Sequence, residues 1–405
     1  MTRHGRAATQ VVSAHFFPAN VRLCVSNPRA IKASRRSEID PFRAMDVMAE
    51  ANRMAAAGID VISLAVGQPS APVPPRVAAV AQRFLEAGRI GYTDALGRMR
   101  LRTRIATHCR EAYGADVDPS RVMVTTGSSA GFNLAFLAAF DPGDRVAIAA
   151  PGYPAYRNIL KALGLVPVEI PVDAGEGYLL TADRLAHEHS QAPLQGVLVA
   201  SPANPTGTVT PRDELGRLIE FANREGIAFI SDEIYHGLVY GEPAASALEF
   251  TDRAIVVNSF SKYYCMTGWR IGWLVLPPSL VRAAERIGQS LYISAPDLSQ
   301  IAAEEVFEAT GELEAIKADY VANRALLMQA LPEIGFRNIA PIDGAFYAYA
   351  GVPEGSGDAS DLARRILAEA HVAVTPGVDF DTVRGECFVR LSYAGDPVAV
   401  AEAVR

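Results

Sequence analysis

The sequence predicts an α/β protein in which helices cover both faces of a mostly parallel sheet, joined to a smaller α+β region. Short apolar runs rich in β-branched residues alternate with helical patterns between residues 122 and 258, which is typical of a parallel sheet buried on both sides. The pattern becomes helical over residues 298–331 and mixed over residues 344–392. A chain of 405 residues is long enough for two or three domains with buried cores.

The first 37 residues differ from the rest because they contain seven Lys or Arg residues and no acidic residue. Polar residues and prolines interrupt any apolar periodicity, so we expect a poorly ordered extension over residues 1–37. An arginine-rich, acid-free start resembles an organelle transit peptide, and a translation start placed too far upstream gives the same composition.

A helix is expected from about residue 38, with Asp40 as its N-terminal cap and Pro41 at its first position. Apolar residues at helical spacing support this helix, and Gly58 ends it. A short strand over residues 61–66 then leads to Gly67.

Strands and helices alternate through the central part of the chain. We expect strands over residues 122–125, 145–149, 165–170, 197–200, 227–230 and 254–258, and helices over residues 128–140, 156–163 and 210–224. Thr210 is expected to cap the last of these helices, and Gly226 to follow its end. Because open α/β sheets bind ligands at the carboxyl ends of their strands, residues that directly follow these strands are candidates for a site.

The smaller α+β region is expected to contain regular elements over residues 344–349, 359–369, 372–374 and 388–392. We therefore expect residues 71–315 to form a large domain, and residues 38–70 and 316–405 to form a small one.

Composition excludes several classes of function. The net charge of −7 offers no basic surface for nucleic acid or an anionic membrane, and no apolar run approaches the ~18 residues of a membrane helix. The cysteines Cys24, Cys109, Cys265 and Cys387 form no C-x-x-C pair, which is typical of a reduced cytosol and argues against zinc and a disulfide framework. We expect a cytoplasmic protein with no metal, nucleic-acid or membrane partner.

Lys262 is the most informative residue of the chain. It follows the expected strand 254–258 and lies between Ser259 and Ser261 on one side and Arg270 on the other. Its amine can form an imine with an aldehyde, and the serines and the arginine can hold a phosphate, so we expect pyridoxal 5′-phosphate, which carries both groups, as cofactor. A solvated surface lysine is commoner, but apolar and aromatic neighbours favour a nucleophilic amine with a lowered pKa.

Three further polar residues lie at the ends of expected strands. Asp232 ends one strand, Tyr235 follows three residues later, and Asn204 follows another strand in Ser-Pro-Ala-Asn-Pro-Thr-Gly. A buried Asp232 can pair with a pyridinium nitrogen, and Tyr235 and Asn204 can bind the ring 3-hydroxyl. The plainer interpretations are a helix cap or loop carboxylate, an aromatic packing residue and an ordinary turn, respectively.

Other candidates belong to weaker patterns. Ser128 and Ser129 begin an apolar helix whose free N-terminal amides attract phosphate, although small residues at such positions are common. Tyr153 follows a strand and can stack on a pyridine ring or simply pack. Arg390 lies within a strand between apolar neighbours, where either a substrate α-carboxylate or a protein carboxylate would satisfy its charge.

Taken together, these residues form a pattern that resembles the class I/II (fold type I) pyridoxal-phosphate aminotransferases, from about Ser37 to the C-terminus. The matching motifs, in order, are Gly67-x-Pro69, Tyr92-x4-Gly97-x3-Leu101-Arg102, Asn204-Pro205-x-Gly207, Asp232-x2-Tyr235, Ser259-x-Ser261-Lys262-x7-Arg270 and Arg390-x-Ser392. The resemblance implies the fold type I architecture and transfer of an amino group from an L-amino acid to a 2-oxo acid.

The resemblance also implies residue roles. Lys262 would bind the cofactor aldehyde and later carry the proton between Cα and C4′, Asp232 would pair with the ring nitrogen, and Arg390 would bind the α-carboxylate with the Gly67 backbone. The remaining cofactor contacts would be the ring 3-hydroxyl with Asn204 and Tyr235, the ring face with Tyr153, and the phosphate with Ser128, Ser129, Ser259, Ser261 and Arg270. Tyr92 would reach the phosphate across a dimer interface, so a homodimer with shared active sites is implied.

Two departures from the family pattern matter. Dicarboxylate-specific relatives often carry a lysine where this chain has Ser129, which argues against aspartate as substrate. The chain also ends soon after Arg390, so its final helix is expected to be short.

Other functions remain open on the same fold, because fold does not fix the reaction. One is a C–S lyase or decarboxylase, and a remote one is a cofactor-sensing domain of a transcription regulator, although no helix-turn-helix pattern precedes the fold. Phe346 and Tyr292 are candidates for the substrate side-chain pocket, or equally for the core.

Overall fold

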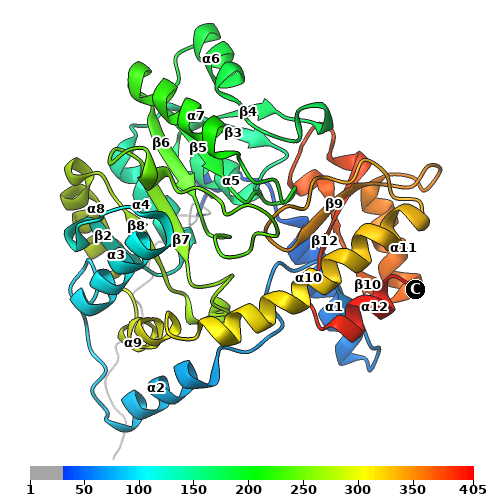
Figure 1. The fold of residues 1–405 in the computed structure, drawn as a ribbon. Helices are drawn as coiled ribbons and strands as arrows, with labels where there is room; N and C mark the ends of the chain where they lie inside the picture. The colour runs from blue at the N-terminus through cyan, green and yellow to red at the C-terminus, as the bar shows by residue number, and fades with distance from the viewer. Residues whose placement is uncertain (1–30) are drawn as a thin grey trace, which may run out of the picture.

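The computed structural model describes residues 31–405 and confirms the predicted α/β class. Its centre is a seven-stranded sheet with strand order β2-β8-β7-β6-β5-β3-β4 (Figure 1). The strands are β2 Val122–Thr125, β3 Arg145–Ala150, β4 Val166–Pro171, β5 Gly196–Ala200, β6 Ala228–Asp232, β7 Ile255–Ser259 and β8 Gly272–Val275. Most of the expected N-terminal extension falls on residues 1–30, outside the described residues.

Strand β8 is the one member of this sheet that the sequence analysis did not predict. It has four residues and begins two positions after Arg270, the last residue of the lysine motif, and so short an apolar run gives only a weak strand pattern. It pairs antiparallel with β2 and β7, whereas the other pairs are parallel. The start of β8 therefore lies at the edge where its neighbours end, and this brings Arg270 to that edge.

Helices cover both faces of the large sheet because its strands are apolar on both sides. In β5, Val197 and Val199 belong to one buried cluster, and Leu198 belongs to another. Helices α3, α6 and α7 pack on the first cluster, and helices α4, α5 and α8 pack on the second. The twelve α-helices of residues 31–405 are α1 Arg43–Ala56, α2 Pro75–Glu86, α3 Met99–Tyr113, α4 Ser128–Ala139, α5 Pro154–Leu163, α6 Ala182–Gln191, α7 Arg212–Glu225, α8 Pro278–Tyr292, α9 Asp297–Val306, α10 Thr310–Glu333, α11 Ala359–Ala370 and α12 Pro397–Ala403.

A second group of strands lies beside the large sheet. It contains a parallel pair, β1 Ile62–Ser63 with β10 Val372–Ala373, and an antiparallel sheet in the order β11-β12-β9. The strands of the antiparallel sheet are β11 Thr375–Pro376, β12 Phe388–Ser392 and β9 Tyr347–Gly351. Helix α10 extends from near α9 toward this group (Figure 1). The final helix, α12, is short, as expected.

Two expected helix caps are wrong. Helix α1 begins at Arg43 and not near Pro41, and Asp40 instead lies 3.3 Å from the Lys161 amine. Helix α7 has Pro211 as its N-cap residue, and the Thr210 amide donates to Ser201 Oγ at 2.9 Å. Asp40 contacts a residue more than 100 positions away, whereas the Thr210 amide binds a hydroxyl nine residues earlier.

The edges of the smaller elements also differ from expectation. The strand expected over residues 61–66 is reduced to Ile62–Ser63, and that expected over residues 344–349 begins only at Tyr347. Helices α2, α3, α6 and α8 were not predicted. The φ of Gly226 is 72°, a left-handed conformation that favours glycine, and this residue ends α7 as predicted.

Candidate active site

A cavity of about 450 Å³ opens at the carboxyl ends of the parallel strands, next to the smaller group of strands. Ten of the predicted site residues line it: Gly67, Ser128, Ser129, Tyr153, Asn204, Tyr235, Ser261, Lys262, Arg270 and Arg390. Asp232 and Ser259 are buried at the ends of β6 and β7 and do not line it. Tyr92 is 83% exposed and lies outside it.

Four neighbouring strands each place one candidate residue at this edge. In spatial order β7, β6, β5 and β3 are adjacent, and they are followed or ended by Lys262, Asp232, Asn204 and Tyr153. Parallel strands end at the same edge, so residues that lie far apart in the chain become neighbours. The predicted clustering of these four residues is therefore a direct result of strand order.

Lys262 lies in a setting that disfavours its charged form. Its half-buried side chain donates from Nζ to the Gly67 carbonyl oxygen at 2.6 Å, and Nζ lies 5.7 Å from the ring centroids of Tyr235 and Phe346. Desolvation, with smaller contributions from Arg390 and Arg270, lowers the pKa of Lys262 to about 8. A substantial fraction of this amine is therefore neutral and nucleophilic near pH 8.

Asp232 is a buried carboxylate, 3% exposed. Its Oδ1 accepts from the Ile234 amide at 3.1 Å, and its Oδ2 accepts a hydrogen bond from the Tyr156 hydroxyl. Burial raises the pKa of Asp232 to about 6, although the bonds from Tyr156 and Ile234 oppose the rise. A cationic partner from a ligand would compensate for the lost solvation.

Arg390 is 5% exposed and lies between two aromatic rings. Its guanidinium carbon is 4.4 Å from the Tyr347 ring centroid and 4.8 Å from that of Phe380. Its hydrogen-bond partners within residues 31–405 are all neutral, namely Asn204 Oδ1 at 3.2 Å, the Ala65 carbonyl and Thr375 Oγ1. This buried cation can therefore accept a ligand carboxylate.

Tyr347 connects the two sides of the cavity. Its hydroxyl lies 2.8 Å from the Tyr235 hydroxyl. A Cβ atom at position 67 would lie 1.7 Å from the Tyr347 hydroxyl oxygen, so Gly67 is required for this close approach.

The opposite end of the cavity can hold an anion. Ser128 begins α4, where the first amides lack intrahelical partners. A Cβ atom at position 127 would lie 2.5 Å from an Arg270 guanidinium nitrogen. Gly127, with a φ of 81°, therefore allows the Arg270 guanidinium to come this close. The Ser259 Oγ accepts from the Ser261 amide at 3.0 Å and donates to the Ile271 carbonyl in a long bond of 3.4 Å.

Several residues at the cavity were not identified from the sequence. Tyr156, Tyr347, Asp379, Phe380, the α1 residues Ala44 and Met45, and the N-cap residue Phe42 all line it. Tyr156 follows Tyr153 by three positions, which places both on one side of α5, but a helical tyrosine is usually a packing residue. Phe346 and Tyr292 do not line the cavity, so their interpretation as core residues is the correct one.

Known proteins resemble this chain over nearly its whole length. Aminotransferase class I and II describes the family that matches residues 59–405. A valine–pyruvate aminotransferase of Mycobacterium tuberculosis is 48% identical over 379 residues, which cover 92% of this chain and 97% of that protein. An aspartate aminotransferase of Streptomyces avermitilis is 33% identical, covering 89% of this chain and 92% of the relative. The crystal structure of an aminotransferase from Mycobacterium tuberculosis superposes with a TM-score of 0.90 at 47% identity, covering 93% of this chain and 97% of that one.

The fold is that of a fold type I transferase. The chain belongs to the class I and II aminotransferases, and it is an enzyme that transfers an amino group between an amino acid and a 2-oxo acid. The resemblance inferred from the six motifs is confirmed, and the lyase and regulator alternatives find no support. Within residues 31–405, each helix is too short or too polar to cross a membrane.

Proposed function

We propose that this aminotransferase binds pyridoxal 5′-phosphate and uses an L-amino acid with an apolar side chain as donor and pyruvate as acceptor. The observation that carries the proposal is the distribution of charge in the cavity. Its cationic side chains are Lys262, Arg270 and Arg390, and none of these is left over for a second substrate carboxylate.

The rest of the wall favours an apolar substrate side chain. Its large apolar side chains are Phe42, Met45, Phe132, Ile159, Ile234 and Phe380. Asp379 adds a carboxylate that would repel a dicarboxylate. The 48% identical relative bears the name valine–pyruvate aminotransferase, which agrees with this choice.

The residues at the site fit pyridoxal phosphate, the cofactor that the resemblance to this family implies. The buried Asp232 suits a protonated ring nitrogen, and Gly127 leaves room above the α4 N-terminus where Arg270 can hold a phosphate. When bound, this cofactor supplies an electron sink for the carbanion formed at the substrate Cα. Asn204 and Tyr235 would bind its 3-hydroxyl, Tyr153 its ring face, and Ser128, Ser129, Ser259 and Ser261 its phosphate.

The chain's own residues would then orient the substrate and move its proton. Arg390 would hold the α-carboxylate in a bidentate bond, which fixes the Cα–H bond relative to Lys262. The lowered pKa of Lys262 suits an amine that takes the proton from Cα and returns it at C4′. Asp232 would remain ionised beside the ring nitrogen and stabilise its positive charge.

The proposed active enzyme is a cytoplasmic homodimer. Tyr92 is exposed and Arg270 is solvent-accessible in one chain, as expected if Tyr92 of a second copy completes the phosphate site. Cys109, Cys265 and Cys387 are free thiols, which suits a reducing compartment. We propose residues 71–315 as the large domain, and residues 38–70 with 316–405 as the small one.

A donor and acceptor panel tests this proposal. The purified protein is loaded with pyridoxal phosphate, and L-valine and L-aspartate are each added without acceptor while the visible absorbance of the protein-bound imine is followed. We expect valine to bleach the absorbance and pyruvate to restore it, with aspartate much slower. Preference for aspartate, or release of ammonia and pyruvate in place of amino transfer, would refute it.

A further inference from the structure

We propose that Asp379 is a positioning residue that fixes the N-terminus of helix α1 as the wall of the substrate side-chain pocket. This inference rests on the proposed function, because it concerns how an apolar side chain is selected. It assigns to Asp379 a task distinct from cofactor binding and from proton transfer.

The carboxylate of Asp379 forms the cap of α1 from the far end of the chain. Its Oδ1 accepts from the Arg43 amide at 2.9 Å, and its Oδ2 accepts from the Ala44 amide at 2.8 Å. The local N-cap residue, Phe42, provides no side-chain cap. Free amides of a first helical turn need acceptors, and a carboxylate also interacts favourably with the helix dipole.

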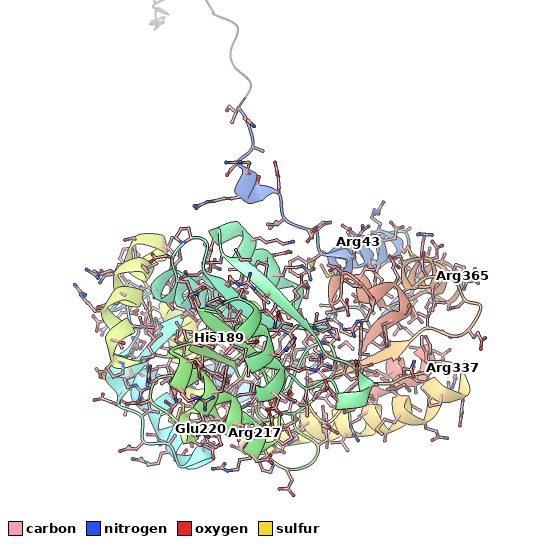
Figure 2. The ribbon with its side chains drawn as sticks, turned by 90° about the horizontal axis from the view of Figure 1, so that it is seen from above. Arg43, His189, Arg217, Glu220, Arg337 and Arg365 are labelled. Carbon is pink, nitrogen blue, oxygen red and sulfur yellow. The ribbon has the colours of Figure 1, made fainter. Side chains whose placement is uncertain are left out.

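The capped turn forms part of the cavity wall. Phe42, Ala44 and Met45 all line the cavity. The Phe42 ring centroid lies 6.3 Å from that of Tyr153, so this wall borders the proposed place of the cofactor ring. Figure 2 shows Arg43 at the surface where α1 begins.

The rest of α1 is held by different contacts. Ala51, with Val47 and Met54, packs on Ala65, Leu367 and Ala373. These contacts fix the later turns of the helix and do not involve Phe42 or Met45. Asp40, just before α1, contacts Lys161 and Asn158, and Asp379 is the residue whose side chain binds the amides of the first turn itself.

Asp379 is also tied to the carboxylate clamp. It is 4% exposed and directly precedes Phe380, whose ring stacks on the Arg390 guanidinium. One short segment thus sets the distance between the group proposed to hold the α-carboxylate and the wall that meets the side chain. This distance determines how large a substrate side chain the pocket accepts.

Loss of this cap should weaken the binding of substrates, and the loss should grow with the size of the substrate side chain. Each buried methylene contributes about a fourfold factor in affinity. Valine has two more carbons than alanine, so complete loss of the wall corresponds to about 15-fold. The clamp at Arg390 and the amine of Lys262 do not move, so the smallest donor should be nearly unaffected.

The test is Asp379→Asn in the loaded full-length enzyme, with Asp46→Asn as matched control. Asparagine keeps the side-chain volume at position 379 but offers one acceptor oxygen to two amides. Asp46 is a suitable control because it is an exposed acid in the first turn of α1. The half-reaction is followed with L-alanine, L-valine or L-leucine as sole donor, which gives a maximal rate and a half-saturating concentration for each.

We expect Asp379→Asn to raise the half-saturating concentration about 3- to 15-fold for valine and more for leucine, with alanine within about twofold. Hydrogen exchange of the amides at 43–46 should accelerate in Asp379→Asn and not in Asp46→Asn. Phe42→Ala, which removes the wall and leaves the cap in place, should show the same dependence on donor size.

Equal losses for all three donors, or unchanged selectivity and unchanged exchange, would overturn the proposal. A wild-type enzyme that reacts with none of the donors would refute the proposed function. The exchange comparison would then still decide whether Asp379 holds α1.

Discussion

The two sides of the cavity are built in different ways. On the cofactor side, Lys262, Asp232 and Asn204 each lie at or within four residues of the end of a strand. On the substrate side, Arg390 and Gly67 belong to segments more than 300 residues apart, and Arg390 bonds to the Ala65 carbonyl. The cofactor side depends on the order of strands in the large sheet. The substrate side depends on contacts between segments from the two ends of the chain.

The difference shows where each side is vulnerable. A substitution on the cofactor side removes a chemical group from a rigid sheet edge, so it should affect the rate of the chemical step. A substitution on the substrate side also disturbs contacts between distant segments, so it should affect binding and selectivity. The four predictions below test this division, beginning with the largest effect.

Lys262→Ala should reduce kcat by about 10⁴-fold or more, because no other amine lines the cavity within residues 31–405. Steady-state turnover of L-valine with pyruvate measures the loss. Lys161→Ala, which removes an exposed lysine paired with Asp40, is the control and should leave kcat unchanged. Normal turnover of Lys262→Ala without added amines would contradict the role of this residue.

Arg390→Met should raise KM for the donor about 30- to 1,000-fold, since it removes a buried cation that binds a carboxylate. The cofactor should stay bound, which its visible absorbance after gel filtration reports. Arg337→Met is the control, because Arg337 is an exposed arginine that pairs with Glu354 and does not line the cavity; Figure 2 shows it at the surface. If Arg390→Met loses the cofactor and keeps its KM, the division between the two sides is wrong.

Gly67→Ala should lower kcat/KM about 5- to 150-fold, because the new Cβ would overlap the Tyr347 hydroxyl. Tyr347→Phe removes that hydroxyl, so the double variant should recover part of the loss. A double-mutant cycle on kcat/KM gives the coupling between the two positions. Additive losses would mean that Gly67 acts independently of Tyr347.

Tyr156→Phe should shift the acidic limb of the kcat/KM profile upward by about one pH unit. The Tyr156 hydroxyl lowers the pKa of Asp232 by donating to it, against a burial effect that raises this pKa to about 6. Without that donor the pKa rises further, so Asp232 becomes neutral at a higher pH and no longer supports a protonated ring nitrogen. Tyr292→Phe is the control, because it removes a hydroxyl outside the cavity and should leave the acidic limb in place. An unshifted acidic limb in Tyr156→Phe would mean that the Tyr156 hydrogen bond does not affect the ionisation of Asp232.

Much of the cofactor side could be predicted from the sequence. Six strands of the large sheet were expected from short apolar runs, and the ends of four of them gave Lys262, Asp232, Asn204 and Tyr153. Strand β8 was missed because it has only four residues, and so short an apolar run gives a weak strand pattern. Tyr156 was missed because a helical tyrosine gives no local sign of the carboxylate that it contacts.

The substrate side was predicted only in part. The resemblance to the family supplied Gly67 and Arg390, and the apolar setting of Arg390 supported the choice. Asp379 could not be found, because its carboxylate bonds to amides 335 and 336 residues away. The expected cap, Asp40, was wrong for the same reason, since a local pattern cannot reveal a distant acceptor.

The sequence by itself determined the α/β class, the family and the chemical groups at the sheet edge, because strand periodicity and the residues after each strand are local features. The sequence also predicted a lowered pKa for Lys262. The tertiary structure alone decided the raised pKa of Asp232, the stacking of Arg390 between Tyr347 and Phe380, and the attachment of α1 to Asp379. These properties depend on desolvation and on contacts between segments that meet only when the chain has folded.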